Sequence, residues 1–319
     1  MASSRHKAWR RRAGHRVQCS QALKVHMMPV QMATSATYLS IKGKINMLLM
    51  RRAHGLLDKL GDMPGLHQWL SSRYDRRFAA NTSENLFRGV FQTFEEAAAS
   101  APRTRPMGYD NPDSALMYRD RMKHLFPTDY PVLFWMQQLF GQGRVRIFEL
   151  GGHIGVSYYA YQSVLTYPAN LQWVIHDVPA VMERGAALAR NRDGLGKLQF
   201  ADDFSEAAQA DIFLAMGVLQ YLPQTLAERL QDLKRLPPNV LVNLTPLHPD
   251  AAYFTLQSIG TAFCPYRIDR EDALVKSLQA LGYTLRDAWI NPDKSCLIPF
   301  SRDRSLNAYH GYHFALTQH

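Results

Sequence analysis

The sequence predicts an α/β protein built on a doubly wound, mainly parallel sheet, with a helical N-terminal segment ahead of it. Two observations predict this class. From Val145 onward short apolar runs alternate with longer amphipathic stretches, and a cluster of glycines follows the first apolar run directly. A strand followed by a helix is the repeating unit of parallel sheets that are covered on both faces.

The individual elements follow from this alternation. Each short apolar run is bounded by turn residues, as expected of a buried strand, and each longer stretch has apolar residues at helical spacing. We expect strands at 145–150, 171–175, 198–201, 211–216, 240–244, 283–289 and 312–316, and helices at 156–165, 180–190, 225–236 and 269–281.

The segment 58–140 reads as helices joined by turns, without the alternation typical of a strand. Asp129 is expected to cap a helix over 130–140 that ends at Gly141. We therefore divide the chain into a basic leader (1–44), a helical segment (45–140) and a sheet domain (141–319). Within 58–140, the apolar residues at helical spacing ahead of this helix are Phe87, Val90, Phe91 and Phe94.

Length and composition exclude several classes of protein. The chain has 319 residues, of which 46% are hydrophobic and 20% charged, so it can bury a sizeable core. No run approaches the roughly 18 consecutive apolar residues of a membrane-spanning helix. The three cysteines are far apart and form no Cys-x-x-Cys pair, which argues against a zinc or dithiol site and favours a reducing compartment, the cytoplasm.

The net charge of +10 is concentrated in the leader. Residues 1–57 contain eleven Lys or Arg and no acid, whereas the rest of the chain has 26 Lys or Arg against 27 Asp or Glu. The leader fits a targeting segment, a basic arm for polyanions, or inert sequence ahead of a later start. We expect residues 1–44 to be disordered, and nothing in the body requires nucleic acid.

The turn after the first strand, from Glu149 to Gly155, is the best candidate for a ligand site. In such sheets the ligand lies beyond the carboxyl ends of the strands, and glycines let the backbone approach it closely. The dinucleotide fingerprint fits poorly, because His153 and Val156 stand where its second and third glycines belong. The spacing Glu-x-Gly-x-x-x-Gly instead suits S-adenosyl-L-methionine, whose ammonium group Glu149 could neutralise.

Two more acids follow at successive strand ends. Asp177 lies 28 residues after Glu149, and Asp202 lies 25 residues after Asp177, each about one strand-helix unit. Asp177 could accept both hydroxyls of a ribose, and Asp202 or Asp203 an adenine amino group. The alternatives are a buried ion pair for Glu149, and helix capping for the three aspartates.

Residues 87–316 resemble a bacterial family of S-adenosylmethionine-dependent methyltransferases associated with surface polysaccharide biosynthesis. Two features depart from the family pattern: His153, where a small residue is usual, and 263–266, where a longer aromatic stretch is usual. The resemblance implies a class I methyltransferase fold whose sheet has seven strands, the last antiparallel. It is carried by Phe91-x-x-Phe94-Glu95-Glu96-Ala97, Gly108-Tyr109-Asp110, Gly151-Gly152-His153-Ile154-Gly155-x-Ser157-Tyr158-Tyr159, Asp177-x-Pro179 and Val218-Leu219-Gln220-Tyr221-Leu222.

We predict an S-adenosylmethionine-dependent methyltransferase that acts on an oxygen of a saccharide or another small molecule. His248, beyond the fifth strand, is the candidate base, although a lone loop histidine often only faces solvent. The acceptor-site candidates are Tyr109, Asp110, Tyr158, Gln220 and Tyr221. The cofactor candidates are Glu149, Gly151, Gly152, His153, Gly155, Asp177, Asp202, Asp203, Met216 and Gly217.

Two other functions stay open: a nicotinamide-nucleotide oxidoreductase on a related fold, and a catalytically inert module with a polyanion-binding arm. Hydrolase, kinase and zinc-protease functions are disfavoured, because the Gly-x-Ser-x-Gly, Gly-Lys-Ser/Thr and His-Glu-x-x-His motifs are missing from the sequence. No pattern of metal ligands is apparent either.

Overall fold

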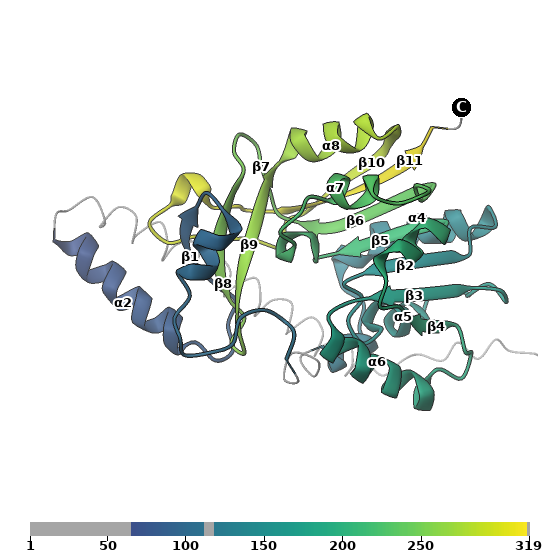
Figure 1. Cartoon of the computed structure of the whole chain (residues 1–319), viewed down its shortest axis with the longest axis horizontal. Helices are drawn as coiled ribbons and strands as arrows, with labels where there is room; N and C mark the ends of the chain where they lie inside the picture. The colour runs from purple at the N-terminus through teal and green to yellow at the C-terminus, as the bar shows by residue number, and fades with distance from the viewer. Residues whose placement is uncertain (1–64, 112–117, 318–319) are drawn as a thin grey trace, which may run out of the picture. The chain divides into compact units, whose positions relative to one another are not determined.

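The structure is a computed structural model that describes residues 65–111 and 118–317 (Figure 1). The predicted basic leader lies outside the described residues. All described residues belong to one unit of the chain, Met47–His319.

A seven-stranded sheet forms the centre, in the order β10-β11-β6-β5-β2-β3-β4 (Figure 1). The pairs among β4, β3, β2, β5 and β6 are parallel, whereas β11 runs antiparallel to both β6 and β10. The predicted fold class is confirmed, including the antiparallel last strand. The strands are β2 (Arg146–Leu150), β3 (Gln172–His176), β4 (Leu198–Phe200), β5 (Ile212–Met216), β6 (Asn239–Thr245), β10 (Tyr283–Asn291) and β11 (Tyr309–Leu316).

Both faces of this sheet are buried, because successive side chains of each strand enter opposite cores. Ile147 of β2 belongs to a core shared with helices on one face, and Phe148 belongs to the core on the other face. The first core contains side chains of α4 (Tyr130–Gly141), α5 (Val156–Tyr161) and α6 (Pro179–Arg192). The second contains side chains of α7 (Leu226–Gln231) and α8 (Glu271–Ala280).

A second sheet has the order β1-β8-β9-β7, and the sequence did not indicate it. The expected helical stretch across Phe87 and Phe91 is wrong, because β1 (Leu86–Phe91) pairs antiparallel with β8 (Tyr253–Ser258). Gly89, at φ 72°, lies within a register shift of this pair, so an irregular strand imitates helical spacing. The connection expected after the fifth strand likewise contains β7 (Leu247–His248), β8 and β9 (Phe263–Arg270).

Short helices complete the N-terminal part. Helix α2 (Leu66–Ala80) buries one side chain, Phe78, against this second sheet, and α3 (Phe94–Ala99) begins at a capping box formed by Thr93 and Glu96. The predicted helix over 130–140 is confirmed as α4. Asp129 precedes it, but its carboxylate accepts hydrogen bonds from Phe126 N (2.7 Å) and the Tyr161 hydroxyl (3.2 Å) instead of capping α4. In the described residues, no helix combines the length and hydrophobicity needed to cross a membrane.

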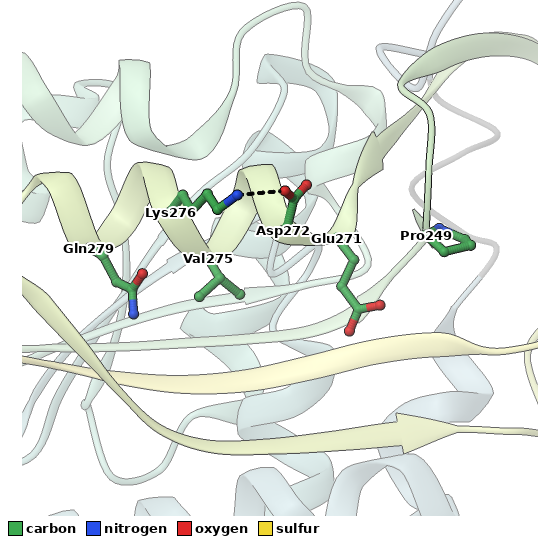
Figure 2. Close-up of a pocket in the computed structure, with 6 residues that line it drawn as sticks. All are labelled: Pro249, Glu271, Asp272, Val275, Lys276 and Gln279. Atoms are coloured by element: carbon green, nitrogen blue, oxygen red, sulfur yellow. Dashed lines mark hydrogen bonds and ion pairs between the residues drawn. The ribbon is translucent and has the colours of Figure 1, made fainter.

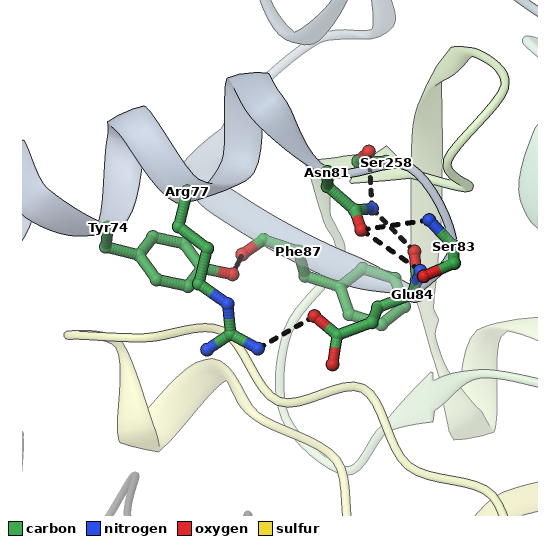
Figure 3. A network of polar contacts seen from close by, with 7 residues as sticks. All are labelled: Tyr74, Arg77, Asn81, Ser83, Glu84, Phe87 and Ser258. Carbon is green, nitrogen blue, oxygen red and sulfur yellow. Dashed lines mark hydrogen bonds and ion pairs between the residues drawn. The ribbon is translucent and has the colours of Figure 1, made fainter.

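Asn81 ties the end of α2 to the second sheet, as Figure 3 shows. Its Nδ2 donates to Glu84 O (2.6 Å) and Ser258 Oγ (2.9 Å), and its Oδ1 accepts from Ser83 N and Glu84 N. Nearby, the Tyr74 hydroxyl donates to Phe87 O at 2.7 Å, whereas the pair Arg77–Glu84 is exposed. The buried amide therefore connects the turn after α2 to β8.

We expect Asn81→Ala to lower the free energy of unfolding by about 1–3 kcal/mol, because it leaves the buried hydroxyl of Ser258 and the backbone of residues 83–84 without these hydrogen bonds. Arg77→Ala is the matched control, since an exposed ion pair contributes at most about 1 kcal/mol. Urea unfolding of both variants measures the difference. Equal, small effects would contradict the role given to Asn81.

His313 of β11 is a buried histidine that favours its neutral form. Its ring lies 4.2 Å from the Trp135 ring, and its Nε2 lies 3.2 Å from Asn239 Oδ1. Burial lowers its pKa to about 4. The unfolded chain therefore binds this proton at higher pH than the folded chain does, and folding stability falls as the pH drops from 6.5 toward 4.

When the pH falls from 7 to 5, protonation of this histidine in the unfolded chain should lower the free energy of unfolding of the wild type by about 2 kcal/mol. Other groups titrate too, and Glu149 acts in the opposite sense because burial raises its pKa to about 7. The informative quantity is therefore the difference between wild type and His313→Gln, measured by urea unfolding at both pH values. If that difference did not change with pH, His313 would not be the group responsible.

Candidate functional site

The order of the central sheet reverses between β2 and β5. In sheets of this kind a ligand lies beyond the carboxyl ends of the strands at such a reversal, and we call this position the crevice. The glycine turn follows β2, and Met216 ends β5. The ends of β3 and β4 lie next along the same edge, because β3 pairs with both β2 and β4. The predicted motif residues thus follow adjacent strands.

The glycine turn has the backbone conformation for which its glycines are needed. Gly151 and Gly155 have φ angles of 71° and 92°, in the left-handed region that side chains disfavour. A Cβ on Gly151 would lie 2.4 Å from Val218 Cγ2, so this glycine also permits the turn to approach the loop after β5. His153 has a positive φ of 55° as well, although it carries a side chain.

Asp177 holds the turn in place from the end of β3. Its Oδ2 accepts from His153 N at 2.8 Å, and its Oδ1 accepts from Val178 N at 2.7 Å. Burial raises the pKa of this carboxyl group, and these two N–H donors oppose the rise. Each oxygen keeps a further lone pair, so the half-buried carboxylate can still accept from a ligand hydroxyl.

The capping role considered for Asp177 belongs to another residue. The N-cap of α6 is Val178, without a side-chain cap. Asp110 Oδ1 instead accepts from Ala180 N at 3.0 Å, in the first turn of α6. Asp110 was predicted to line the acceptor site. Its carboxylate instead accepts a hydrogen bond from the backbone at the start of α6.

Asp202 and Asp203, at the end of β4, have different environments. Asp203 caps the following 3-10 helix (Phe204–Gln209) by accepting from Ser205 N (2.8 Å) and Ser205 Oγ (2.6 Å), and these bonds lower its pKa. The capping alternative is therefore confirmed for Asp203. Asp202 is exposed, and its carboxylate has no hydrogen-bond partner among the described residues. Asp202 remains the candidate for the adenine.

Glu149 does not line the crevice in the manner expected. Its side chain is 1% exposed and lies beneath the turn, where it accepts from Trp173 Nε1 at 2.8 Å. A Cβ on Gly152 would lie 2.7 Å from Glu149 Oε2, which explains the glycine there. Such burial does not agree with direct contact between Glu149 and an ammonium group, and it indicates support of the turn.

The loop after β5 forms the opposite side of the crevice. Met216 Sδ lies 3.4 Å from the Tyr161 hydroxyl, which donates to Asp129, and Gly217 has a φ of 68°. Gln220 Nε2 donates to Gly217 O at 2.8 Å, whereas its buried Oε1 has no hydrogen-bond partner in the described part of the chain. A buried oxygen without a partner is unusual in a folded protein.

Tyr109 and Tyr221, which are 112 residues apart in sequence, lie together at this loop. The Tyr109 hydroxyl donates to the Tyr221 hydroxyl at 3.2 Å, and the rings are 4.9 Å apart. Tyr118 joins them, with its hydroxyl 3.4 Å from that of Tyr109 and its ring 5.0 Å from that of His153. Sequence reasoning missed Tyr118, because no local pattern distinguishes it.

Two predicted site residues lie elsewhere. His248 is buried in β7, where its Nδ1 accepts from Asp250 N and Ala251 N and its Nε2 donates to Asp303 O (2.8 Å). Both ring nitrogens are occupied, so the structure contradicts its assignment as a base. Tyr158 is fully buried and donates to Asp193, which also binds the first residue of β4, at the amino ends of the strands. It does not line the acceptor side.

A separate hollow of about 390 Å³ lies along α8 (Figure 2). Lys276 and Asp272 form an exposed pair there at 2.8 Å, and Glu271 accepts from the Tyr312 hydroxyl at 3.1 Å. None of the predicted site residues lines this hollow, so it is distinct from the crevice. Its lining residues are Pro249, Glu271, Asp272, Val275, Lys276 and Gln279.

The chain matches no family model and no curated protein. It is similar to the solved 1,6-didemethyltoxoflavin-N1-methyltransferase of Burkholderia thailandensis with bound S-adenosylhomocysteine (16% identity, TM-score 0.40, 60% of this chain and 79% of that chain). It is also similar to human N-acetylserotonin methyltransferase in complex with S-adenosylmethionine (12%, 0.43, 82% and 69%).

Proposed function

We propose that the chain is an S-adenosylmethionine-dependent methyltransferase that acts on an oxygen of a saccharide or another small-molecule acceptor. The observation that carries this proposal is the joining of the glycine turn to Asp177 at the edge where the sheet order reverses. A ligand placed there meets close backbone on one side and a carboxylate with free lone pairs on the other.

The donor and acceptor groups of the crevice fit an adenosyl cofactor with a positively charged end. Asp177 would bind the ribose hydroxyls, and the unpaired carboxylate of Asp202 would accept from the adenine amino group. Glu149 supports the turn from beneath, where it accepts from Trp173 Nε1.

The same groups fit a dinucleotide less well. No ion pair joins Asp177 or Asp202 to a lysine or arginine within the described ranges, so no basic side chain offsets the charge of these two carboxylates. A pyrophosphate beside these carboxylates would be repelled. His153 also occupies the position of the second fingerprint glycine. The nicotinamide-nucleotide alternative is therefore disfavoured.

S-adenosylmethionine supplies an activated methyl group on its sulfonium, so the chain mainly has to align an acceptor with it. The turn and Asp177 fix the adenosyl end, and the loop after β5 forms the boundary toward the acceptor. With both nitrogens of His248 engaged, we assign it no part in proton transfer.

Titration calorimetry of the full chain with S-adenosylhomocysteine, NAD and NADP tests this proposal. We expect one site for S-adenosylhomocysteine and no measurable heat for either dinucleotide. Binding of NAD or NADP without binding of S-adenosylhomocysteine would instead support the oxidoreductase alternative.

A further inference from the structure

Three tyrosine hydroxyls and one amide form a continuous hydrogen-bonded chain beside the crevice. Tyr118 lies directly before a 3-10 helix (Arg119–Lys123), and its hydroxyl is 3.4 Å from the hydroxyl of Tyr109. The Tyr109 hydroxyl is in turn 3.2 Å from the hydroxyl of Tyr221. Tyr221, in a second 3-10 helix (Leu219–Tyr221), donates to Gln257 Oε1 of β8 at 2.9 Å. Four separate segments thus contribute one residue each.

All the hydrogen bonds of this network run in one donor-to-acceptor direction, because the amide of Gln257 can only accept at its end of the network. Gln257 Nε2 donates to Asn85 Oδ1 at 3.4 Å, which leaves Oε1, an atom that only accepts, toward Tyr221. Each phenol has a single proton to donate. Because Tyr221 gives its proton to Gln257, Tyr109 donates to Tyr221, and Tyr118 must donate to Tyr109.

The Tyr118 oxygen is therefore left with accepting lone pairs. Among the residues that the structure describes, its hydroxyl has no hydrogen-bond partner besides Tyr109. The Tyr118 ring packs against His153 of the glycine turn, and the guanidinium carbon of Arg121 lies 5.7 Å from the ring centre. Through Tyr109, the same phenol connects to Tyr221 after β5.

The inner phenols stay protonated, so the direction of the chain persists at neutral pH. Burial raises the pKa of Tyr109 and of Tyr221 well above the ordinary value, and neighbouring tyrosines add to the rise. These groups therefore act as hydrogen-bond donors and not as bases. An anionic or purely accepting ligand group would find no proton available at Tyr118.

We propose that Tyr118 accepts a hydrogen bond from a hydroxyl of the methyl acceptor, and so selects acceptors that carry a donor group. This inference rests on the proposed function and extends it, because it names a specificity residue and the chemistry of the group it selects. A hydroxyl held by Tyr118 lies between the glycine turn and the loop after β5, and its own lone pairs remain free.

A pair of probes of similar shape tests the inference on the full chain saturated with S-adenosylhomocysteine. 4-Fluorophenol carries the hydroxyl, whereas fluorobenzene lacks it, and ¹⁹F NMR titration gives the Kd of each. We expect wild type to prefer 4-fluorophenol by roughly five-fold, as for one neutral hydrogen bond. Tyr118→Phe should abolish this preference, and Tyr130→Phe, at a 60% exposed tyrosine, should retain it.

The outcomes separate this inference from the proposed function, because binding of S-adenosylhomocysteine is measured first by calorimetry. If it does not bind, the proposed function fails and the assignment of Tyr118 fails with it. If it binds, but 4-fluorophenol shows no preference or keeps its preference in Tyr118→Phe, the assignment of Tyr118 alone is overturned.

Discussion

Asp177→Ala is expected to weaken binding of S-adenosylhomocysteine by roughly ten-fold to one hundred-fold, the loss that accompanies removal of charge-assisted hydrogen bonds. The carboxylate has two tasks, which are to accept from the ribose hydroxyls and to hold His153 N and Val178 N in place. Both tasks are lost in alanine. Titration calorimetry measures the change in affinity.

Asp203→Ala is the matched control for this experiment. Asp203 also follows a strand at the same edge, but its carboxylate caps a short helix through Ser205. Its removal should leave affinity within two-fold of wild type. Equal affinity of Asp177→Ala and wild type, in protein with an unchanged melting temperature, would contradict the ribose assignment.

Gly151→Ala is expected to damage the turn more severely. Alanine in the left-handed region costs about 1–2 kcal/mol, and forcing atoms into a packed site costs a further 1–3 kcal/mol or so. Here the added methyl group would lie 2.4 Å from Val218 Cγ2, at a φ of 71°. We expect the free energy of unfolding to fall by about 2–4 kcal/mol and cofactor affinity to fall at least ten-fold.

Two further variants identify the cause. Gly194→Ala should be nearly neutral, because Gly194 has no neighbour within 4 Å of an added Cβ and no positive φ. Val218→Ala, added to Gly151→Ala, should recover the part of the loss that comes from the overlap. Urea unfolding measures all three variants, and a neutral Gly151→Ala would show that the turn is not constrained as described.

The central sheet could be predicted because its strands are buried on both faces and read as apolar runs. Ile147 and Phe148 are examples, since they lie in the cores on opposite faces and mark the strand locally. The second sheet could not be predicted in this way. Leu86 pairs with Ser258 across 172 residues, and a glycine with positive φ interrupts the strand pattern of β1.

The candidate site was predictable where residues follow strands, and less so where side-chain direction matters. Gly151 and Asp177 are placed by their strands alone. Glu149 was expected to face the ligand, but the alternation of β2 directs it toward Trp173. The sequence did not show that His248 Nε2 is already hydrogen-bonded, because its partner Asp303 is 55 residues away. Tyr118 acquires its position only through tertiary contacts.

A crystal structure of the full chain grown with S-adenosylhomocysteine would test the central claim most directly. We predict adenosyl density at the carboxyl ends of β2 and β3, with the ribose hydroxyls about 2.6–2.8 Å from the Asp177 carboxylate and the adenine beside Asp202. Density for the same ligand at another surface, with the Asp177 carboxylate free of it, would contradict the assignment of this crevice.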